Sequence, residues 1–150
     1  MTGPRIVVAC SDADWAEAVC RHLRNGGFDA AAAEDAFTLA QKLQAAKPDL
    51  LIVDFALPGG DGPTLYERLQ GNTRTMDVPI IFISDISPEE ARRKVPASAK
   101  VAFLGKPVSV SLLEGIIGRI LGPRKPPQSR PLFTGEADDS DEGPTVVDLD

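Results

Sequence analysis

Five short apolar runs alternate with longer amphipathic segments along the first 121 residues of the chain. Ile6–Cys10 is representative, because almost every position in it is hydrophobic and several are β-branched. Runs of this kind are typical of strands that are buried on both faces of a parallel sheet. The pattern predicts strands at residues 6–10, 28–33, 49–54, 78–83 and 100–104.

The segments between these runs have helical periodicity and begin at residues that favour helix N-caps. In the first helix the apolar stripe is expected to include Trp15, Ala18, Val19, His22 and Leu23. Caps are expected at Asp12, Asp35, Ser87 and Ser109. Pro96 should limit the fourth helix to about two turns. Five strands alternating with five helices predict an α/β fold with a doubly wound five-stranded parallel sheet, covered on both faces.

The composition is that of a globular protein that acts away from membranes and nucleic acids. Hydrophobic residues make up 43% of the 150 residues, and the net charge is -6. An acidic chain lacks the positive surface that binds DNA or anionic lipid. Two cysteines are too few for a disulfide framework, and no apolar run approaches the length of a membrane span. We therefore expect a cytoplasmic protein that binds neither nucleic acid nor membrane.

The composition changes after the fifth predicted helix. Residues 122–150 are rich in proline and hold three basic and seven acidic residues, a net charge of -4 that leaves -2 for the rest of the chain. Such a segment has no apolar stripe to offset its ordering entropy. We expect residues 1–121 to form one domain and residues 122–150 to be a disordered tail or linker. The apolar end of the tail, 145–150, is alternatively a short docking peptide.

Polar residues follow the predicted strands at their carboxyl ends, where α/β sheets place ligands and chemistry. These residues are Asp12 after the first strand, Asp54 after the third, Ser84 and Asp85 after the fourth, and Lys106 after the fifth. The sequence thus predicts a functional site at this edge of the sheet.

The site residues and their spacing resemble a known family, the receiver domains of two-component response regulators. Residues 54–62 resemble the strand end and loop that carry that family's phosphoacceptor. Ser84 follows Asp54 by thirty residues, Lys106 follows Ser84 by twenty-two, and Phe103 precedes the lysine by three. The likeness covers residues 5–121 and implies the flavodoxin-like (βα)5 fold of receivers.

The resemblance implies a role for each of these side chains. Asp54 would accept a phosphoryl group from a histidine kinase and carry it as a mixed anhydride. Lys106 would neutralise phosphoryl charge, and Ser84 would donate a hydrogen bond to a phosphoryl oxygen. Phe103 would be the aromatic switch residue that moves inward with Ser84 on activation. Such a domain is a signalling switch and not an enzyme with its own turnover.

The sequence departs from the family at the magnesium site. Receivers carry an adjacent acidic pair after the first strand, and Cys10 and Ser11 take those positions here. Magnesium prefers carboxylate and water oxygens, so a thiol and a hydroxyl are poor substitutes, and Mg²⁺ binding through Asp12 and Asp54 is expected to be weak or absent. Asp85 is an extra anion next to Ser84. Three interpretations of Asp85 are open. Its charge would repel a phosphoryl donor, it would join Asp12 and Asp54 in a rearranged carboxylate cluster, or its side chain would point to solvent.

Three functions remain open. The favoured one is a pseudo-receiver that recruits proteins without metal-dependent phosphotransfer, and the second is a working switch phosphorylated on Asp54. The third, a flavin- or nucleotide-binding protein on the same fold, is weak because residues 10–14 lack glycine and carry carboxylates where a phosphate would lie. The expected partner is a histidine kinase or another signalling protein, and a homodimer through the fourth and fifth helices is also compatible with the sequence.

Overall fold

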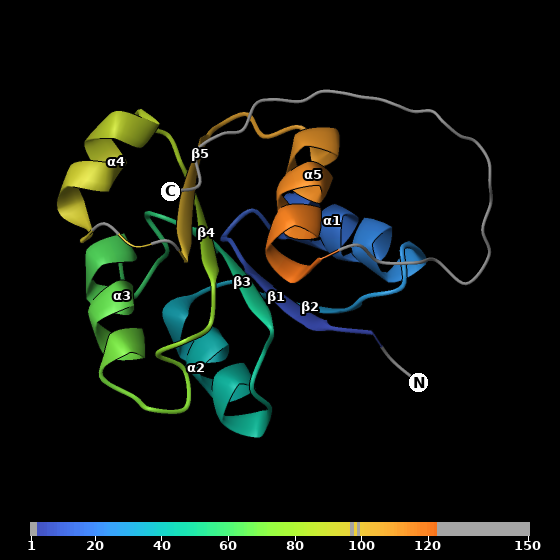
Figure 1. The fold of residues 1–150 in the computed structure, drawn as a ribbon, viewed down its shortest axis with the longest axis horizontal. Helices are drawn as coiled ribbons and strands as arrows, with labels where there is room; N and C mark the ends of the chain where they lie inside the picture. The colour runs from blue at the N-terminus through green and yellow to red at the C-terminus, as the bar shows by residue number, and fades with distance from the viewer. Residues whose placement is uncertain (1–2, 97, 99, 123–150) are drawn as a thin grey trace.

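The computed structural model describes residues 3–96, 98 and 100–122, and the predicted tail lies outside the described residues beyond Gly122. The elements alternate strictly between strand and helix (Figure 1). In chain order they are β1 (Arg5–Ala9), α1 (Ala13–Asn25), β2 (Asp29–Ala33), α2 (Ala36–Ala45), β3 (Leu50–Asp54), α3 (Gly62–Gln70), β4 (Ile80–Ser84), α4 (Pro88–Lys94), β5 (Val101–Gly105) and α5 (Val110–Leu121). All five predicted strands and all five predicted helices are present.

The strands form a single parallel sheet in the order β2-β1-β3-β4-β5. Val8, for example, pairs with Ala32 on one side and with Ile52 on the other. Every residue of β3 and of β4 is buried, which explains why their sequences are continuous apolar runs. The sheet confirms the predicted doubly wound, flavodoxin-like fold, and it brings the carboxyl ends of all five strands to one edge.

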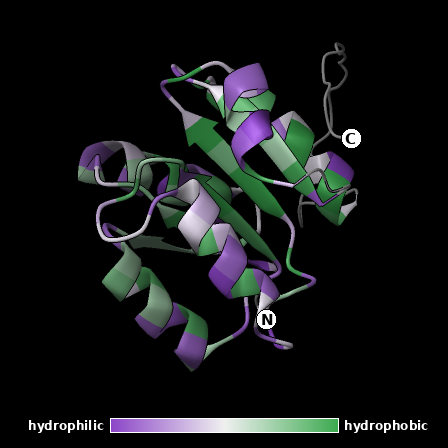
Figure 2. Ribbon diagram, turned by 90° about the vertical axis from the view of Figure 1, so that its left-hand side faces the viewer, coloured by the Kyte–Doolittle hydropathy of each residue, from purple (hydrophilic) through white to green (hydrophobic). Residues whose placement is uncertain are grey.

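Helices cover the sheet on both faces, with α1 and α5 on one face and α2, α3 and α4 on the other (Figure 1). Alternate strand residues point to opposite faces, so Val8 belongs to the core beneath α1 and α5, while Val7 belongs to the core beneath α2, α3 and α4. The strands are hydrophobic along almost their whole length, and the helices carry polar residues on their outer sides (Figure 2). Among the described residues, no helix is both long enough and apolar enough to cross a bilayer.

The predicted helix caps are confirmed at all four positions. Asp12, Asp35, Ser87 and Ser109 each accept a hydrogen bond from the backbone N–H three residues ahead, at 2.8–3.1 Å. Each cap supplies a partner for an N–H that the helix itself leaves unpaired. The fourth helix has seven residues and ends before Pro96, as predicted.

The predicted apolar stripe of α1 was wrong at two positions. The buried residues are Ala16, Val19, Cys20 and Leu23, whereas Ala18 and His22 are exposed. Alanine and cysteine are only weakly hydrophobic, so two helix faces that are one residue apart fit the sequence about equally well. His22 instead lies at the surface with its Nε2 atom 2.7 Å from Glu114 Oε2, and this contact links α1 to α5.

A close approach of two segments fixes the start of α3. The Gly62 N–H donates a 2.7 Å hydrogen bond to the carbonyl oxygen of Phe55, and a Cβ atom on Gly62 would overlap the Phe55 ring. The ring cannot move away freely, because it is buried against Phe82 and Phe103. Only glycine fits at position 62.

Two glycine-to-alanine changes should therefore have opposite effects on stability. Gly62→Ala should lower the free energy of unfolding by about 1–3 kcal/mol, since the added methyl overpacks the Phe55 contact. Gly118→Ala should raise it by up to about 1 kcal/mol, because a Cβ there meets no atom within 4 Å and alanine is the better helix former. Urea denaturation of both variants measures the two shifts. A Gly62→Ala protein as stable as the parent would contradict the packing described for Phe55.

Candidate functional site

The edge of the sheet at the carboxyl ends of the strands brings the predicted site residues close together. Asp54 is the last residue of β3, and Ser84 is the last residue of the neighbouring β4. Cys10 directly follows β1, and Lys106 directly follows β5. The Lys106 N–H donates to the Ser84 carbonyl oxygen at 2.8 Å, so β5 positions its lysine directly beside the end of β4.

Asp54 is the most buried charged residue of this edge, with 4% of its surface exposed. One carboxylate oxygen, Oδ1, accepts a 3.0 Å hydrogen bond from the Ala56 backbone N–H. The other, Oδ2, accepts from Lys106 Nζ at 3.0 Å and from Cys10 Sγ at 3.5 Å. Both oxygens therefore have protein partners, as a buried carboxylate requires.

Lys106 is shared between two carboxylates. Its ammonium group contacts Asp54 and lies 3.8 Å from Asp85 Oδ2. Burial favours the neutral amine, but the hydrogen bond to Asp54 and the charges of Asp54 and Asp85 outweigh it, so the pKa of Lys106 is raised. The lysine is a fixed positive charge at neutral pH. Asp85 itself is mostly exposed, with 81% of its side chain accessible.

Cys10 contributes a neutral thiol to the site. Burial raises the pKa of its thiol above the usual value, and the nearby charge of Asp54 raises it further. The folded state therefore holds the proton on sulfur through the neutral pH range. A protonated thiol can donate to Asp54, as observed, but metals bind the thiolate form of cysteine and magnesium prefers oxygen ligands.

The side chains near Asp54 do not fit a magnesium ion. Asp12 is exposed, and its Oδ1 atom accepts the N–H of Trp15 as the cap of α1. Within the part of the chain that the structure describes, no three histidine, cysteine or acidic side chains are grouped so that they could hold a metal. Asp12, Asp54 and Asp85 accordingly do not form a metal-holding group among the described residues.

The side chains of Ser84 and Phe103 point away from the Asp54–Lys106 ion pair, although the Ser84 backbone carbonyl accepts the Lys106 N–H. The Ser84 hydroxyl is buried and donates to the carbonyl oxygen of Ile86 at 2.7 Å. The Phe103 ring is buried, stacks on Phe82 with 5.7 Å between ring centroids, and contacts Phe55 edge-on at 6.4 Å. Both predicted switch residues thus point inward.

A groove of about 480 Å³ opens next to the buried pair. Trp15, Pro107 and Val108 provide apolar walls, while Cys10 and Lys106 lie where the groove reaches the site. The Lys106–Pro107 peptide bond is cis, as the resemblance implies. The groove makes the edge of the site accessible although Asp54 itself is buried.

Sequence reasoning missed the residues that connect the site to α4. The guanidinium of Arg92 lies over the Phe103 ring, 5.6 Å from its centroid. Phe55, Phe82 and Phe103 form one aromatic cluster beneath it, drawn from three segments of the chain. No local pattern predicts such contacts, because they depend on how α4 packs against β5.

The comparison with known proteins agrees with the geometry. Residues 6–117 match the response regulator receiver domain family. The phosphate regulon transcriptional regulatory protein PhoB of Escherichia coli (strain K12) is 30% identical over 120 residues, which cover 77% of this chain and 52% of PhoB. Protein Rrf1 of Nitratidesulfovibrio vulgaris is 30% identical over 117 residues, covering 78% of this chain and 82% of Rrf1.

A solved structure shows the same fold. The chemotaxis response regulator CheY4 of Vibrio cholerae superposes with a TM-score of 0.71 at 20% identity, covering 79% of this chain and 99% of CheY4. The chain spans about half the length of PhoB, so the match concerns one part of that regulator. The family match over most of the chain, on a five-stranded parallel sheet with an aspartate and a lysine paired at its carboxyl edge, establishes that the chain belongs to the response regulator receiver domain family of two-component signalling.

Proposed function

We propose that this receiver domain is a protein-interaction module that works without metal-dependent phosphotransfer. Receiver domains interact with histidine kinases and other signalling proteins, and this chain is a receiver domain. The observation that carries the proposal is the contact between Cys10 Sγ and Asp54 Oδ2 at 3.5 Å. The side chain that reaches Asp54 from the end of β1 is a neutral thiol, where phosphotransfer would need a carboxylate to hold magnesium.

The charges around Asp54 support the same conclusion. A transferring phosphoryl group brings negative charge that metal ions and cationic side chains must neutralise. Lys106 supplies one positive charge, which is already shared between Asp54 and Asp85. Without a metal, an incoming phosphoryl donor would meet two carboxylates and one ammonium group, an arrangement that repels it.

The position of Phe103 indicates how such a domain would act. In receiver domains the aromatic switch residue moves inward on activation. Phe103 is already buried under Arg92 and against Phe82. The surface formed by α4 and α5 is then presented to partners without a phosphoryl group on Asp54. We place the protein partner on this surface, and a second copy of the chain is one such partner.

We further propose that this domain has no catalytic turnover, is cytoplasmic and does not contact nucleic acid directly. PhoB is named a transcriptional regulatory protein, but the chain matches only about half of it. The acidic net charge of -6 favours protein partners over DNA.

The second candidate function is a working phosphoacceptor. It is favoured by the placement of Lys106 Nζ, 3.0 Å from Asp54, and by the groove that leads to the site. In this case Asp54 would attack the phosphorus of a kinase phosphohistidine, and the phosphorus–nitrogen bond would break as the mixed anhydride forms. Lys106 would then neutralise the phosphoryl oxygens.

Phosphorylation by a small donor distinguishes the two functions. The parent protein, incubated with acetyl phosphate and magnesium, should show no phosphoryl adduct by intact mass, because the charge on the donor is not offset. A variant with Cys10→Asp and Ser11→Asp should gain an adduct that disappears when Asp54→Asn is added. An adduct on the parent that depends on Asp54 would establish the phosphoacceptor function and refute the proposal.

Magnesium should stabilise only the variant in which the carboxylates are restored. A bound ligand at about 100 times its dissociation constant adds about 2.7 kcal/mol to the free energy of unfolding. With magnesium present, the melting temperature of the Cys10→Asp, Ser11→Asp protein should therefore rise by several degrees. Magnesium should leave the melting temperature of the parent unchanged, and likewise that of the size-matched control with Cys10→Asn and Ser11→Asn. A clear rise in the melting temperature of the parent on adding magnesium would show that a metal site exists despite Cys10.

Partner capture should depend on the helical surface more than on Asp54. Asp54→Ala and Asp54→Asn proteins should retain the partners that the parent captures in a pull-down. Arg93→Glu on α4 and Leu112→Glu on α5 should lose them, since both side chains are exposed on the proposed surface. Circular dichroism controls for folding. Loss of the same partners in both Asp54 variants would show that the phosphoacceptor position still governs binding.

A further inference from the structure

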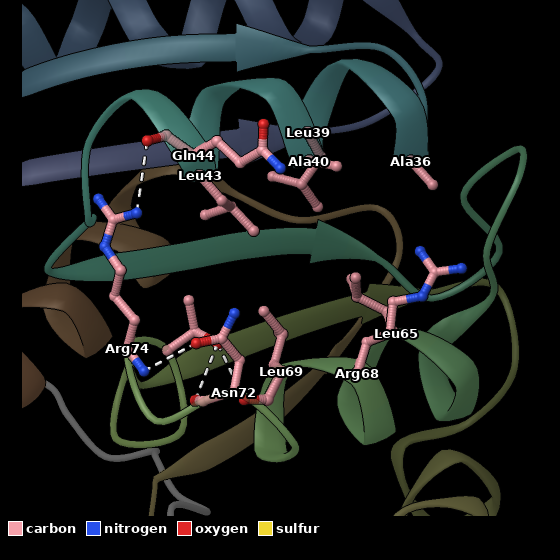
Figure 3. A pocket seen from close by; sticks show the side chains of 11 residues that line it. Ala36, Leu39, Ala40, Leu43, Gln44, Leu65, Arg68, Leu69, Asn72 and Arg74 are labelled. Carbon is pink, nitrogen blue, oxygen red and sulfur yellow. Dashed lines mark hydrogen bonds between the residues drawn. The ribbon is translucent and has the colours of Figure 1, made fainter.

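A second groove lies between α2 and α3, on the face of the sheet opposite α1 and α5 (Figure 3). Its floor consists of the buried side chains of Leu39, Leu65 and Leu69. Ala40 and Leu43 line the side formed by α2. Because the floor leucines are almost completely buried, Ala40 and Leu43 provide most of the accessible apolar surface of the groove, which lies away from the site around Asp54.

The groove has a positive rim. Arg74 lies at one end and Arg68 towards the other (Figure 3). Arg74 donates through Nη1 to the backbone carbonyl oxygen of Gln44 at 3.4 Å, and neither arginine takes part in an ion pair found among the described residues. No acidic side chain lines the groove. Two positive charges therefore border an apolar strip without a carboxylate to balance them.

The size of the groove indicates what it can hold. Its volume is about 160 Å³. Cavities for drug-sized molecules and cofactors typically measure about 300–1,000 Å³. A space of this size suits one or two aliphatic side chains of a bound peptide. The chemistry of the groove therefore favours a short peptide with apolar and acidic residues.

The chain itself contains a segment with these properties. Residues 136–150 carry seven acidic residues and no basic one, and this segment ends with Val146, Val147, Asp148, Leu149 and Asp150. We infer that the acidic C-terminal segment of this chain docks in the α2–α3 groove. Its valine and leucine side chains contact Ala40 and Leu43 above the floor, and its aspartates pair with Arg68 and Arg74.

The connection between α5 and this segment is long enough for docking within one molecule. Val146 lies 24 residues beyond Gly122. A flexible linker of that length has a root-mean-square span of roughly 25–30 Å. A domain of this size has a radius of gyration of about 13 Å, so the segment can reach the opposite face. Tethering also gives an effective concentration of about millimolar, which makes a weak contact sufficient.

The inference is tested on the full-length chain with a spin label in the tail. Thr145→Cys supplies the attachment site, while Cys10 and Cys20 are buried and remain unlabelled, as intact mass will verify. The nitroxide should broaden the backbone amide signals of Leu43, Gln44, Leu69 and Asn72 in a ¹⁵N spectrum. The same signals should be sharp after the nitroxide is reduced.

Matched charge reversals identify the interaction. Arg68→Glu with Arg74→Glu should abolish most of the broadening, because both positive charges at the rim are replaced by negative ones. Arg21→Glu with Arg119→Glu changes the total charge equally, but on α1 and α5, and should leave the broadening unchanged. Unshifted amide signals in β3 and β4 confirm that each variant is folded.

Three results would overturn the inference. The first is broadening that is absent at the groove or centred on another surface. The second is equal broadening in both charge-reversed proteins. The third comes from mixing two proteins, one isotope-labelled without a nitroxide and the other carrying the nitroxide without isotope label. Broadening in that mixture would show that the groove binds the tail of a second copy.

Discussion

The ion pair between Asp54 and Lys106 determines how this edge of the molecule is organised. It joins the ends of β3 and β5 across β4, with 3.0 Å between Nζ and Oδ2. A buried carboxylate is tolerated only with such a partner, since removing either member leaves an uncompensated charge. The sheet meets this requirement because parallel pairing brings the carboxyl ends of its strands to one edge. The same parallel pairing of the strands therefore produces both the sheet and the contact between Asp54 and Lys106.

Much of this arrangement is encoded locally and could be predicted. The continuous apolar runs predicted the strands, because a parallel strand buried on both faces cannot carry polar residues. The caps at Asp12 and Ser87 were also predictable, since capping depends on a side chain and an N–H only three residues apart. The position of Lys106 followed from its spacing relative to Asp54 and Ser84, which the resemblance to receivers supplied.

The failures arose where a side chain depends on tertiary packing. The buried face of α1 was misjudged because alanines on either face differ little in hydrophobicity, so Cys20 rather than Ala18 faces the core. The hydrogen bond from the Ser84 hydroxyl to the Ile86 carbonyl oxygen was not foreseen either, and the hydrogen bond of Ser84 to a phosphoryl oxygen stays a prediction. The contact of Arg92 with Phe103 depends on the placement of α4 and has no signal in the sequence.

The single thiol of Cys10 changes what the same geometry can do. The Cys10 thiol, directly after β1, donates a hydrogen bond to Asp54 at a position where a metal-binding carboxylate would add negative charge, and the other partners of Asp54 are the Ala56 N–H and the Lys106 ammonium group. Both oxygens of Asp54 thus have protein partners, and Lys106 is the cation that offsets the charges of Asp54 and Asp85. Phe103 is at the same time packed inward under Arg92, which ties α4 to the sheet. The proposed function follows from this packing, because a receiver whose switch residues are already buried could present its α4–α5 surface without a phosphoryl group on Asp54.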